Sequence, residues 1–369
     1  MSEHVRLESL DVFRGLTIAA MILVNTPGTW DAVYAPLEHA VWNGWTPTDL
    51  VFPFLLFAMG AAVPFAIARR REARRTVRRH VIRRGAILFA LGLLLTAIET
   101  TPPLALATFR ILGVLQRIAI VYVIVAVLTE RTSVRTQAIV ATAVLVGYWG
   151  LMRLVPVPGV GAGVLTPDGN LAAFIDRAVF GRHLAFGTWD SEGLLSTLPA
   201  VATALCGVFA GTWLTRHERM PHHTIRLAAL GAGVALVGWT WGRVFPINKN
   251  LWTSSFALLT AGLATIALAA CHWLLDVKDW RWWTPPFVAF GRNPLAGYFL
   301  SVGLDSVLTR WTTETGMSLK WLLYLRGFAS WAEPCCGAEA ASLAYSLAYV
   351  VLWALVLMAM RRRRIYIGI

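Results

Sequence analysis

Long apolar stretches alternate with short polar segments along the whole chain. A helix needs about 20 mostly apolar residues to cross a hydrocarbon core of roughly 30 Å. The pattern therefore predicts an all-α, polytopic membrane protein with about ten transmembrane helices. The predicted spans lie near residues 10–27, 48–68, 82–98, 110–129, 136–154, 194–214, 225–243, 252–275, 286–305 and 343–360.

The composition supports a membrane location. Of the 369 residues, 57% are hydrophobic and only 14% are charged, which is too apolar for a soluble globular protein of this length. No linker or repeat divides the chain, so we expect one membrane domain over residues 1–369. Its longer outer loops are expected near residues 26–48, 155–193 and 306–342, and long loops on one face usually build a site there.

The net charge of +13 comes from cations that gather in alternate connections. Arginine and lysine cluster within residues 69–84, 131–135, 216–226, 278–281 and 361–364. This is the positive-inside pattern, and it places both termini in the cytoplasm and the loop over residues 25–49 outside. Because topology explains the basicity, we expect the lipid bilayer and not a nucleic acid as the partner of these cations.

The outer loop over residues 25–49 carries three polar residues that suit catalysis. His39 can take a proton from an attacking group, as histidine side chains do in many enzymes. Asp49 can fix the tautomer of that ring, and the Asn25 amide can donate to a developing oxyanion. Each also has a structural explanation, as a surface histidine, a helix N-terminal residue and a C-cap. Their occurrence together at one membrane rim favours a catalytic site.

Arg110, Gln116 and Arg117 belong to one run at the start of the fourth predicted span. Arg110 and Arg117 are seven residues apart and share a helix face. An arginine in mid-span costs about 2.5–3.5 kcal/mol, so an anionic or strongly accepting partner is expected. That partner is either internal, such as Asp305 or Glu99, or a bound phosphate or carbonyl.

Two further cations lie at the cytoplasmic ends of predicted spans. Arg14 either snorkels to the surface or holds a phosphate. Arg292 and Asn293 precede Pro294, which interrupts the ninth span and frees backbone carbonyls. Because broken helices in membranes commonly line cavities, we expect a cavity that opens to the cytoplasm and is lined by Arg14 and Arg292.

Two outer motifs suit a polar ligand. The segment over residues 189–193 offers carboxylates, including Glu192, beside an aromatic ring, which suits an amino sugar. Asn248, Lys249, Asn250 and Trp252 offer donors, acceptors and a second ring. Loop and N-cap roles are the alternative for both motifs. The histidines and the four cysteines show no metal-type spacing, so no metal site is expected.

Several stretches resemble the heparan-α-glucosaminide N-acetyltransferase family of transmembrane acyltransferases, and the opening of the chain is most similar to the family's bacterial branch. They occur in the family's order and cover most of the chain. The matching stretches are RLESLDVFRG at 6–15, VN at 24–25, HAVWNG at 39–44, DLVFP at 49–53, RILGVLQR at 110–117, EGLL at 192–195, NKNLW at 248–252 and GRN at 291–293, with Tyr298.

The resemblance implies that acetyl-CoA from the cytoplasm acetylates the amine of a glucosamine unit on the far side. It places the catalytic histidine on His39 and the functional asparagine on Asn25, and Asp49 would orient the ring. It also implies a homodimer in a bacterial inner membrane. Acetyl-CoA would be bound by Arg14, Arg110, Gln116, Arg117, Arg292 and Asn293, and the acceptor by Glu192, Asn248, Lys249, Asn250 and Trp252.

Animal members carry an extra leading span and a luminal segment, and their stretch between Asn25 and His39 is shorter. We therefore expect the acceptor to be a free amino sugar or a cell-wall fragment instead of heparan. Direct transfer and an acetyl-histidine intermediate both remain open. The alternative functions are a transporter of amino sugars or anionic solutes, which buried arginines and a broken span also suit, and an O-acetyltransferase of a surface polysaccharide.

Overall fold

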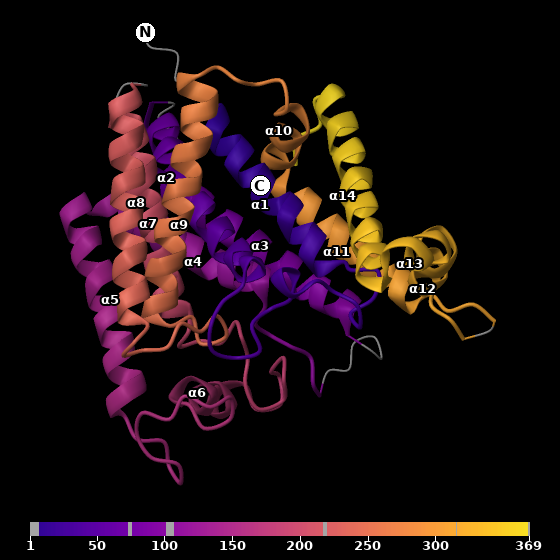
Figure 1. Cartoon of the computed structure of the whole chain (residues 1–369). Coiled ribbons are helices and arrows are strands. Elements are labelled where there is room, and N and C mark those ends of the chain that lie inside the picture. The colour runs from indigo at the N-terminus through magenta and orange to yellow at the C-terminus, as the bar shows by residue number, and fades with distance from the viewer. Residues whose placement is uncertain (1–6, 73–75, 101–106, 217–219, 315, 368–369) are drawn as a thin grey trace. The chain divides into compact units, whose positions relative to one another are not determined.

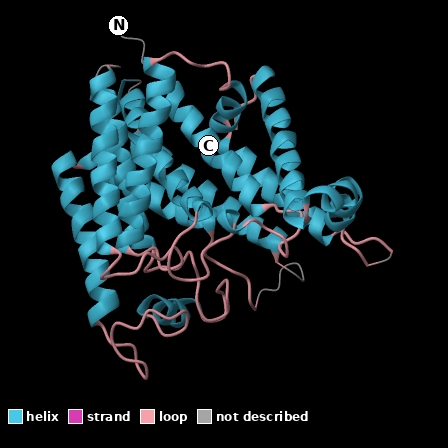
Figure 2. Cartoon of the chain, viewed as in Figure 1, coloured by secondary structure: helices cyan, strands magenta, loops and turns pink. Residues whose placement is uncertain are grey.

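A computed structural model describes residues 7–72, 76–100, 107–216, 220–314 and 316–367. The described chain is helical throughout, with loops between the helices and no strand in these ranges (Figure 2). Of the residues used above, Arg6, Arg74, Arg75 and Arg219 lie outside the described part. All ten predicted spans coincide with helices, and the ninth is divided into two.

The helices follow one another in the order labelled in Figure 1. The longer ones are α1 (Glu8–Asn25), α2 (Val51–Glu72), α3 (Val77–Glu99), α4 (Val114–Arg131), α5 (Val134–Leu154), α6 (Leu171–Phe180), α7 (Thr197–Arg216), α8 (Pro221–Trp241), α9 (Ser254–His272), α10 (Pro285–Arg292), α11 (Pro294–Arg310), α12 (Leu319–Tyr324), α13 (Ser330–Cys336) and α14 (Ala338–Arg362). Short 3-10 or π turns are η1 (Ala35–Leu37), η2 (Pro47–Leu50), η3 (Trp273–Val277) and η4 (Leu325–Ala329).

Seven of the described helices are long and apolar enough to cross a membrane. They are α2, α3, α5, α7, α8, α9 and α14, where α2 and α9 are extended by the adjoining short turns. The predicted number of about ten is not confirmed, since α1 and α4 each carry three charged residues in 18 and α11 has only 17 residues. The chain is a multi-pass membrane protein.

Contacts divide the chain into two compact units. The first unit comprises residues 1–10, 40–45 and 53–279, and it contains α3 to α9 and all of α2 except its first two residues. Its helices meet through small residues, as membrane helices often do. A Cβ atom on Gly262 of α9 would lie 2.3 Å from the backbone nitrogen of Ala235 in α8, and one on Gly60 of α2 would lie 2.0 Å from the Ala204 carbonyl oxygen in α7. These contacts leave no room for larger side chains.

The second unit comprises residues 11–39, 46–52 and 280–369. The helices α1 and α10 approach closely at two glycines, because a Cβ on Gly15 would lie 1.8 Å from the Phe287 carbonyl oxygen and one on Gly291 would lie 1.8 Å from the Asp11 carbonyl oxygen. The predicted break in the ninth span is confirmed, since α10 ends at Arg292 and α11 begins at Pro294. The stretch over residues 319–336 forms three short helical pieces, and α13 packs beside the start of α14 (Figure 1).

Candidate functional site

The structure brings His39 and Asp49 together in the second unit. The loop after α1 passes through η1 to His39 and returns through η2 into α2. His39 Nδ1 lies 2.7 Å from Asp49 Oδ1. The Asp49 side chain is fully buried, whereas 41% of the His39 side chain is exposed. A buried carboxylate therefore holds one nitrogen of an accessible imidazole.

A capping box at the start of η2 fixes the Asp49 carboxylate. Its Oδ2 accepts from the Thr46 backbone N–H at 3.0 Å, while the Thr46 side chain accepts from the Asp49 backbone. Thr46 Oγ1 also donates to the Glu38 carbonyl at 2.6 Å, which ties down the residue before His39. Since Asp49 Oδ1 accepts the Nδ1 proton, Nε2 keeps its lone pair and can act as a base.

Asn25 is the last residue of α1 and is half-buried in the same unit. Its side chain makes no hydrogen bond with the described residues, so its amide is available to a ligand. The turn that follows is held against α14, because Ser342 Oγ accepts from the Thr29 N–H at 3.2 Å and donates to the Thr29 carbonyl at 3.0 Å. The end of α1 is thus anchored at the point where the outer loop begins.

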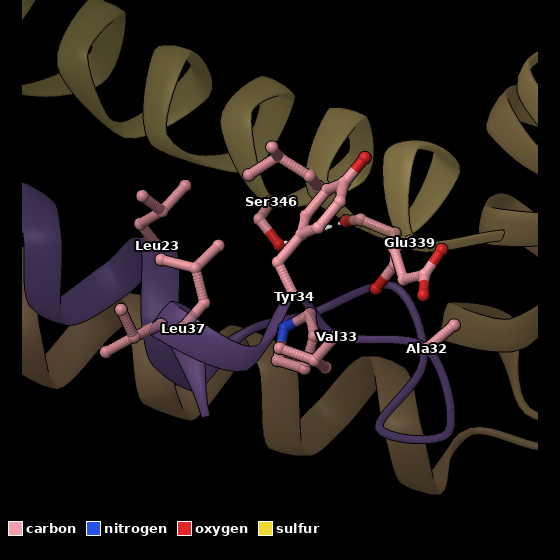
Figure 3. A pocket seen from close by; sticks show the side chains of 11 residues that line it. Leu23, Ala32, Val33, Tyr34, Leu37, Glu339 and Ser346 are labelled. Atoms are coloured by element: carbon pink, nitrogen blue, oxygen red, sulfur yellow. Dashed lines mark hydrogen bonds between the residues drawn. The ribbon is translucent and has the colours of Figure 1, made fainter. Parts of the chain in front are cut away.

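The loop between α1 and His39 also packs against α14. A small cavity of about 10 Å³ separates them, which is room for one water molecule. Figure 3 shows Tyr34 rising toward α14, close to the labelled Ser346 and Glu339, with Leu23 and Leu37 on the α1 side. The loop therefore lies against α14 on its way to His39.

In the first unit, Arg110 binds two carboxylates of the segment before α7. Its Nε and Nη2 donate to the two oxygens of Asp190 at 2.9 and 2.6 Å, and Nη2 also bonds Glu192. Asp190 and Glu192 are buried. Arg110 and Glu192 were predicted to bind different ligands, but the structure joins them in one ion-pair network.

The charges of this network favour one another. Burial opposes ionisation of Glu192, yet Arg110 and Arg117 hold its pKa at about 2. Burial also opposes the charge on Arg110, but Glu192 and Asp190 raise the Arg110 pKa above its ordinary value. Both groups therefore stay charged at any pH at which the protein works.

Asp176 is a member of this region that the sequence reasoning missed. It lies on the buried face of α6, and its Oδ1 accepts from the Leu194 N–H at 2.8 Å. A Cβ on Gly193 would lie 1.9 Å from Asp176 Oδ2, so a larger residue there would displace this carboxylate. Burial raises the pKa of Asp176 to about 6. The sequence did contain a signal for this residue, because Asp176 is a carboxylate on the apolar face of the short amphipathic helix α6.

Arg117 is fully buried in α4 and contacts the same segment. Its Nη2 donates to Ser196 Oγ and, at 3.2 Å, to the Gly193 carbonyl, and its guanidinium lies 5.2 Å from the centroid of the Trp252 ring. These groups replace the internal partners expected from the sequence, since Asp305 pairs with Lys320 at 2.9 Å in the second unit.

Three donors beside this cluster have no partner among the described residues: Nε and Nη1 of Arg117 and Nε2 of Gln116. Gln116 is buried in a space left by two glycines, because a Cβ on Gly92 would lie 2.3 Å from Gln116 Oε1 and one on Gly113 would lie 3.0 Å away. Buried donors without acceptors are costly, so this place suits a ligand or water oxygen.

Of the four predicted acceptor-binding residues just before α9, two are buried and two are half-buried. Asn248 is buried and works within the chain, since its Oδ1 accepts from the Leu251 N–H at 2.8 Å and its Nδ2 donates to Asn43 at 3.2 Å. Trp252 is also buried, and its Nε1 donates to Thr203 Oγ1 at 3.1 Å. Lys249 and Asn250 are half-buried, and Lys249 is close enough to lower the pKa of Glu192.

Arg14, Arg292 and Asn293 lie together in the second unit. Arg14 donates to Asp11 at 2.7 Å and to the Gly291 carbonyl at 2.8 Å, and Arg292 Nε lies 4.0 Å from the same Asp11 side chain. Asn293 holds the C-terminal segment, because its Oδ1 accepts from the Ile367 N–H at 2.9 Å. Acetyl-CoA binding by these three residues stays a prediction.

Known proteins resemble most of this chain. The family described as heparan-alpha-glucosaminide N-acetyltransferase, catalytic, matches residues 6–240. Heparan-alpha-glucosaminide N-acetyltransferase from Homo sapiens is 30% identical over 349 residues, which cover 79% of this chain and 52% of the human protein. The enzyme of the same name from Mus musculus is 28% identical over 79% of this chain and 53% of its own length.

The chain spans about half the length of these two relatives. The match to the family covers more than half of this chain and includes His39, Asp49, Arg110, Arg117 and Glu192. The chain therefore belongs to the heparan-alpha-glucosaminide N-acetyltransferase catalytic family.

Proposed function

We propose that this protein is a transmembrane N-acetyltransferase that moves an acetyl group from cytoplasmic acetyl-CoA to the amine of a glucosamine-type sugar on the periplasmic side. The observation that carries the proposal is the His39–Asp49 pair, in which a buried carboxylate holds Nδ1 of an imidazole whose side chain is 41% exposed. The human and mouse relatives are named for the same transfer to a glucosaminide.

The proposed reaction forms one bond and breaks another. The neutral amine attacks the thioester carbonyl, and Nε2 of His39 takes the proton that the nitrogen loses. The Asn25 amide donates to the oxyanion of the tetrahedral intermediate. Collapse breaks the carbon–sulfur bond, and the departing thiolate takes the proton from the imidazolium. Asp49 keeps the ring in the reactive tautomer.

A two-step route uses the same imidazole as the nucleophile. In that route Nε2 attacks the thioester, CoA leaves as the thiol, and the amine then attacks acetyl-Nε2. Incubation with acetyl-CoA alone distinguishes the two routes. Release of one thiol per protein without acceptor supports the acetyl-histidine, and release only with acceptor supports direct transfer.

The binding roles are proposed on the same basis. For acetyl-CoA, the donors without partners on Gln116 and Arg117 suit a phosphate or carbonyl oxygen better than Arg110, whose guanidinium is already bound by two carboxylates. Arg14, Arg292 and Asn293 are the other proposed acetyl-CoA residues. For the acceptor we propose Glu192, Asn248, Lys249, Asn250 and Trp252. A homodimer in a bacterial inner membrane, with cytoplasmic termini, completes the proposal.

The test uses the purified full chain with acetyl-CoA and glucosamine. We expect release of free thiol and a product heavier by one acetyl group, and we expect His39→Ala to lower the rate by about 10²-fold or more. His222→Ala is the matched control, because His222 is an exposed histidine of α8. Thiol release that survives His39→Ala would remove His39 from the reaction.

A transporter is the second candidate, favoured by the break between α10 and α11 at Asn293. Proteoliposomes that accumulate radiolabelled glucosamine without acetyl-CoA would support it. An O-acetyltransferase is distinguished from an N-acetyltransferase by its product. Hydroxylamine at neutral pH cleaves an acetyl ester, whereas an acetyl amide survives.

A further inference from the structure

A second polar cavity lies within the first unit, where one end of each of α2, α4, α5 and α7 comes together. Its volume is about 510 Å³, which is within the range of small-molecule sites. Residues of its wall include the apolar Pro64 and Ile67 and the hydroxyls of Thr132 and Ser133. None of the residues proposed for acetyl transfer lines it.

Three arginines line this cavity: Arg71, Arg135 and Arg216. Arg71 Nη2 donates to the Glu130 backbone carbonyl at 2.9 Å. Arg135 and Arg216 have no ion pair or hydrogen bond with the described residues. The nearby carboxylates of Glu72 and Glu130 are not part of the wall. The charged side chains among the described residues that line the cavity are therefore all positive.

The first turn of α5 adds to this charge. Ser133 is the N-cap of α5, and its side chain accepts from the Thr136 N–H at 3.2 Å. A helix N-terminus carries a partial positive charge that favours anions. Exposed arginines beside a helix end are also common at membrane surfaces, so these features alone do not define a site.

Gln137 provides an independent observation. It lines the cavity and is only 2% exposed, and its Oε1 accepts no hydrogen bond from any residue that the structure describes. Its Nε2 donates to the Thr132 carbonyl at 3.0 Å, so the amide cannot be reversed without placing two oxygens together. A buried acceptor without a donor is costly, so this wall carries a polar group that the described residues leave unsatisfied.

We propose that this cavity binds a phosphate ester that carries a hydroxyl or N–H donor next to its phosphate. The guanidinium groups and the α5 N-terminus match the phosphate oxygens, the Gln137 carbonyl matches the donor, and Pro64 and Ile67 match an apolar remainder. Two ligands share this chemistry: the nucleotide end of coenzyme A and an anionic glycerophospholipid such as phosphatidylglycerol. The coenzyme A source rests on the proposed acetyl transfer, whereas the lipid source does not.

The test measures binding in two arms on the full chain. In the first, calorimetry in detergent gives the affinity for coenzyme A, with no acceptor present. In the second, native mass spectrometry counts phosphatidylglycerol molecules retained from nanodiscs, with phosphatidylcholine as the neutral comparison. The variants are Arg135→Gln with Arg216→Gln, the same pair changed to lysine, and Arg226→Gln, an exposed arginine of α8 outside the cavity.

We expect the double glutamine variant to weaken one of the two ligands by about tenfold or more, the lysine pair to retain most of the binding, and Arg226→Gln to match the parent. The arm that responds identifies the source. Unchanged binding of both ligands in the double glutamine variant overturns the proposal. The single variants answer the same question if the double variant does not fold. Coenzyme A binding without acetyl transfer would contradict the proposed reaction and leave this site intact.

Discussion

Two polar centres of this protein use their carboxylates in opposite ways. In the second unit, the buried Asp49 supports an imidazole that is 41% exposed. In the first unit, Arg110 binds the carboxylates of Asp190 and Glu192, which are themselves buried. In the first arrangement the carboxylate supports a partly exposed ring, and in the second the carboxylates pair with a cation of the same chain. The difference is consistent with the proposal that His39 reacts, whereas the Arg110 network joins its segment to the one before α7 by internal ion pairs.

The largest effect is expected from Arg110→Ala, which would leave two carboxylates buried without their cation. Removing one partner of a buried pair typically costs about 3–5 kcal/mol, so the thermal unfolding midpoint should fall steeply. Intrinsic fluorescence during heating measures it. Arg182→Ala is the control, because Arg182 is an exposed residue of the same outer segment. Equal losses for both variants would show that the network contributes little.

Asp49→Asn should come next and should affect the reaction more than the fold. An asparagine Oδ1 can still accept from Thr46, but its amide would donate to Nδ1 and leave the proton on Nε2. We expect kcat to fall by about 10²-fold with KM nearly unchanged. Steady-state kinetics with acetyl-CoA and glucosamine separate the two constants. A rise in KM alone would assign Asp49 to binding and not to the ring.

Asp176 predicts a pH dependence that belongs to the first unit alone. Its pKa is about 6 in the folded protein against 3.8 ordinarily, so the folded state binds the proton more tightly. Stability should therefore fall as pH rises from about 4 to 6, by on the order of 1–3 kcal/mol, and stay low above 6.

Asp176→Asn should flatten this fall, which unfolding midpoints at pH 4.5 and 7 would detect. Glu192 interferes little with the measurement. Its pKa is about 2 in the folded protein against 4.5 ordinarily, so its stabilising contribution is present above about pH 4.5 and is lost as pH falls from there toward 2. A slope that persists in Asp176→Asn would assign the effect to another group.

The smallest effect is expected from Thr46→Ala, which removes the side-chain half of the capping box. Loss of an N-cap costs about 1 kcal/mol, and the freed Glu38 carbonyl should loosen the residue before His39. We expect a modest drop in both the unfolding midpoint and kcat. Thr46→Ser keeps the hydroxyl and should restore both. A serine variant as impaired as the alanine variant would contradict the capping role.

The helices could be predicted because their signal is local. A run of about 20 apolar residues specifies a span whatever it packs against, and Pro294 specifies a break within one. The number of spans could be predicted less well, because charged residues inside α1 and α4 weaken the apolar pattern without preventing the helix.

Contacts in the candidate sites could be predicted only between residues that are close in the sequence. The contact between His39 and Asp49 was predictable because only ten residues and one helix start separate them. Arg110 and Asp190 are 80 residues apart, so nothing in the sequence indicated that they pair. Arg117 illustrates the remaining difficulty: its burial required a partner, but the partner is a serine and a backbone carbonyl near residue 193, which no charge pattern reveals.

The Asp49 carboxylate bonds both the Thr46 backbone and the His39 ring, so it limits where this loop can change in length. One oxygen of Asp49 starts a helix and the other holds the ring, so the spacing between His39 and Asp49 is tied to the start of α2. An inserted residue between them would force the chain to give up one of the two bonds. Insertions between Thr29 and Tyr34 would leave both bonds in place. Homologous loops should therefore vary in length before the histidine and keep a constant spacing after it.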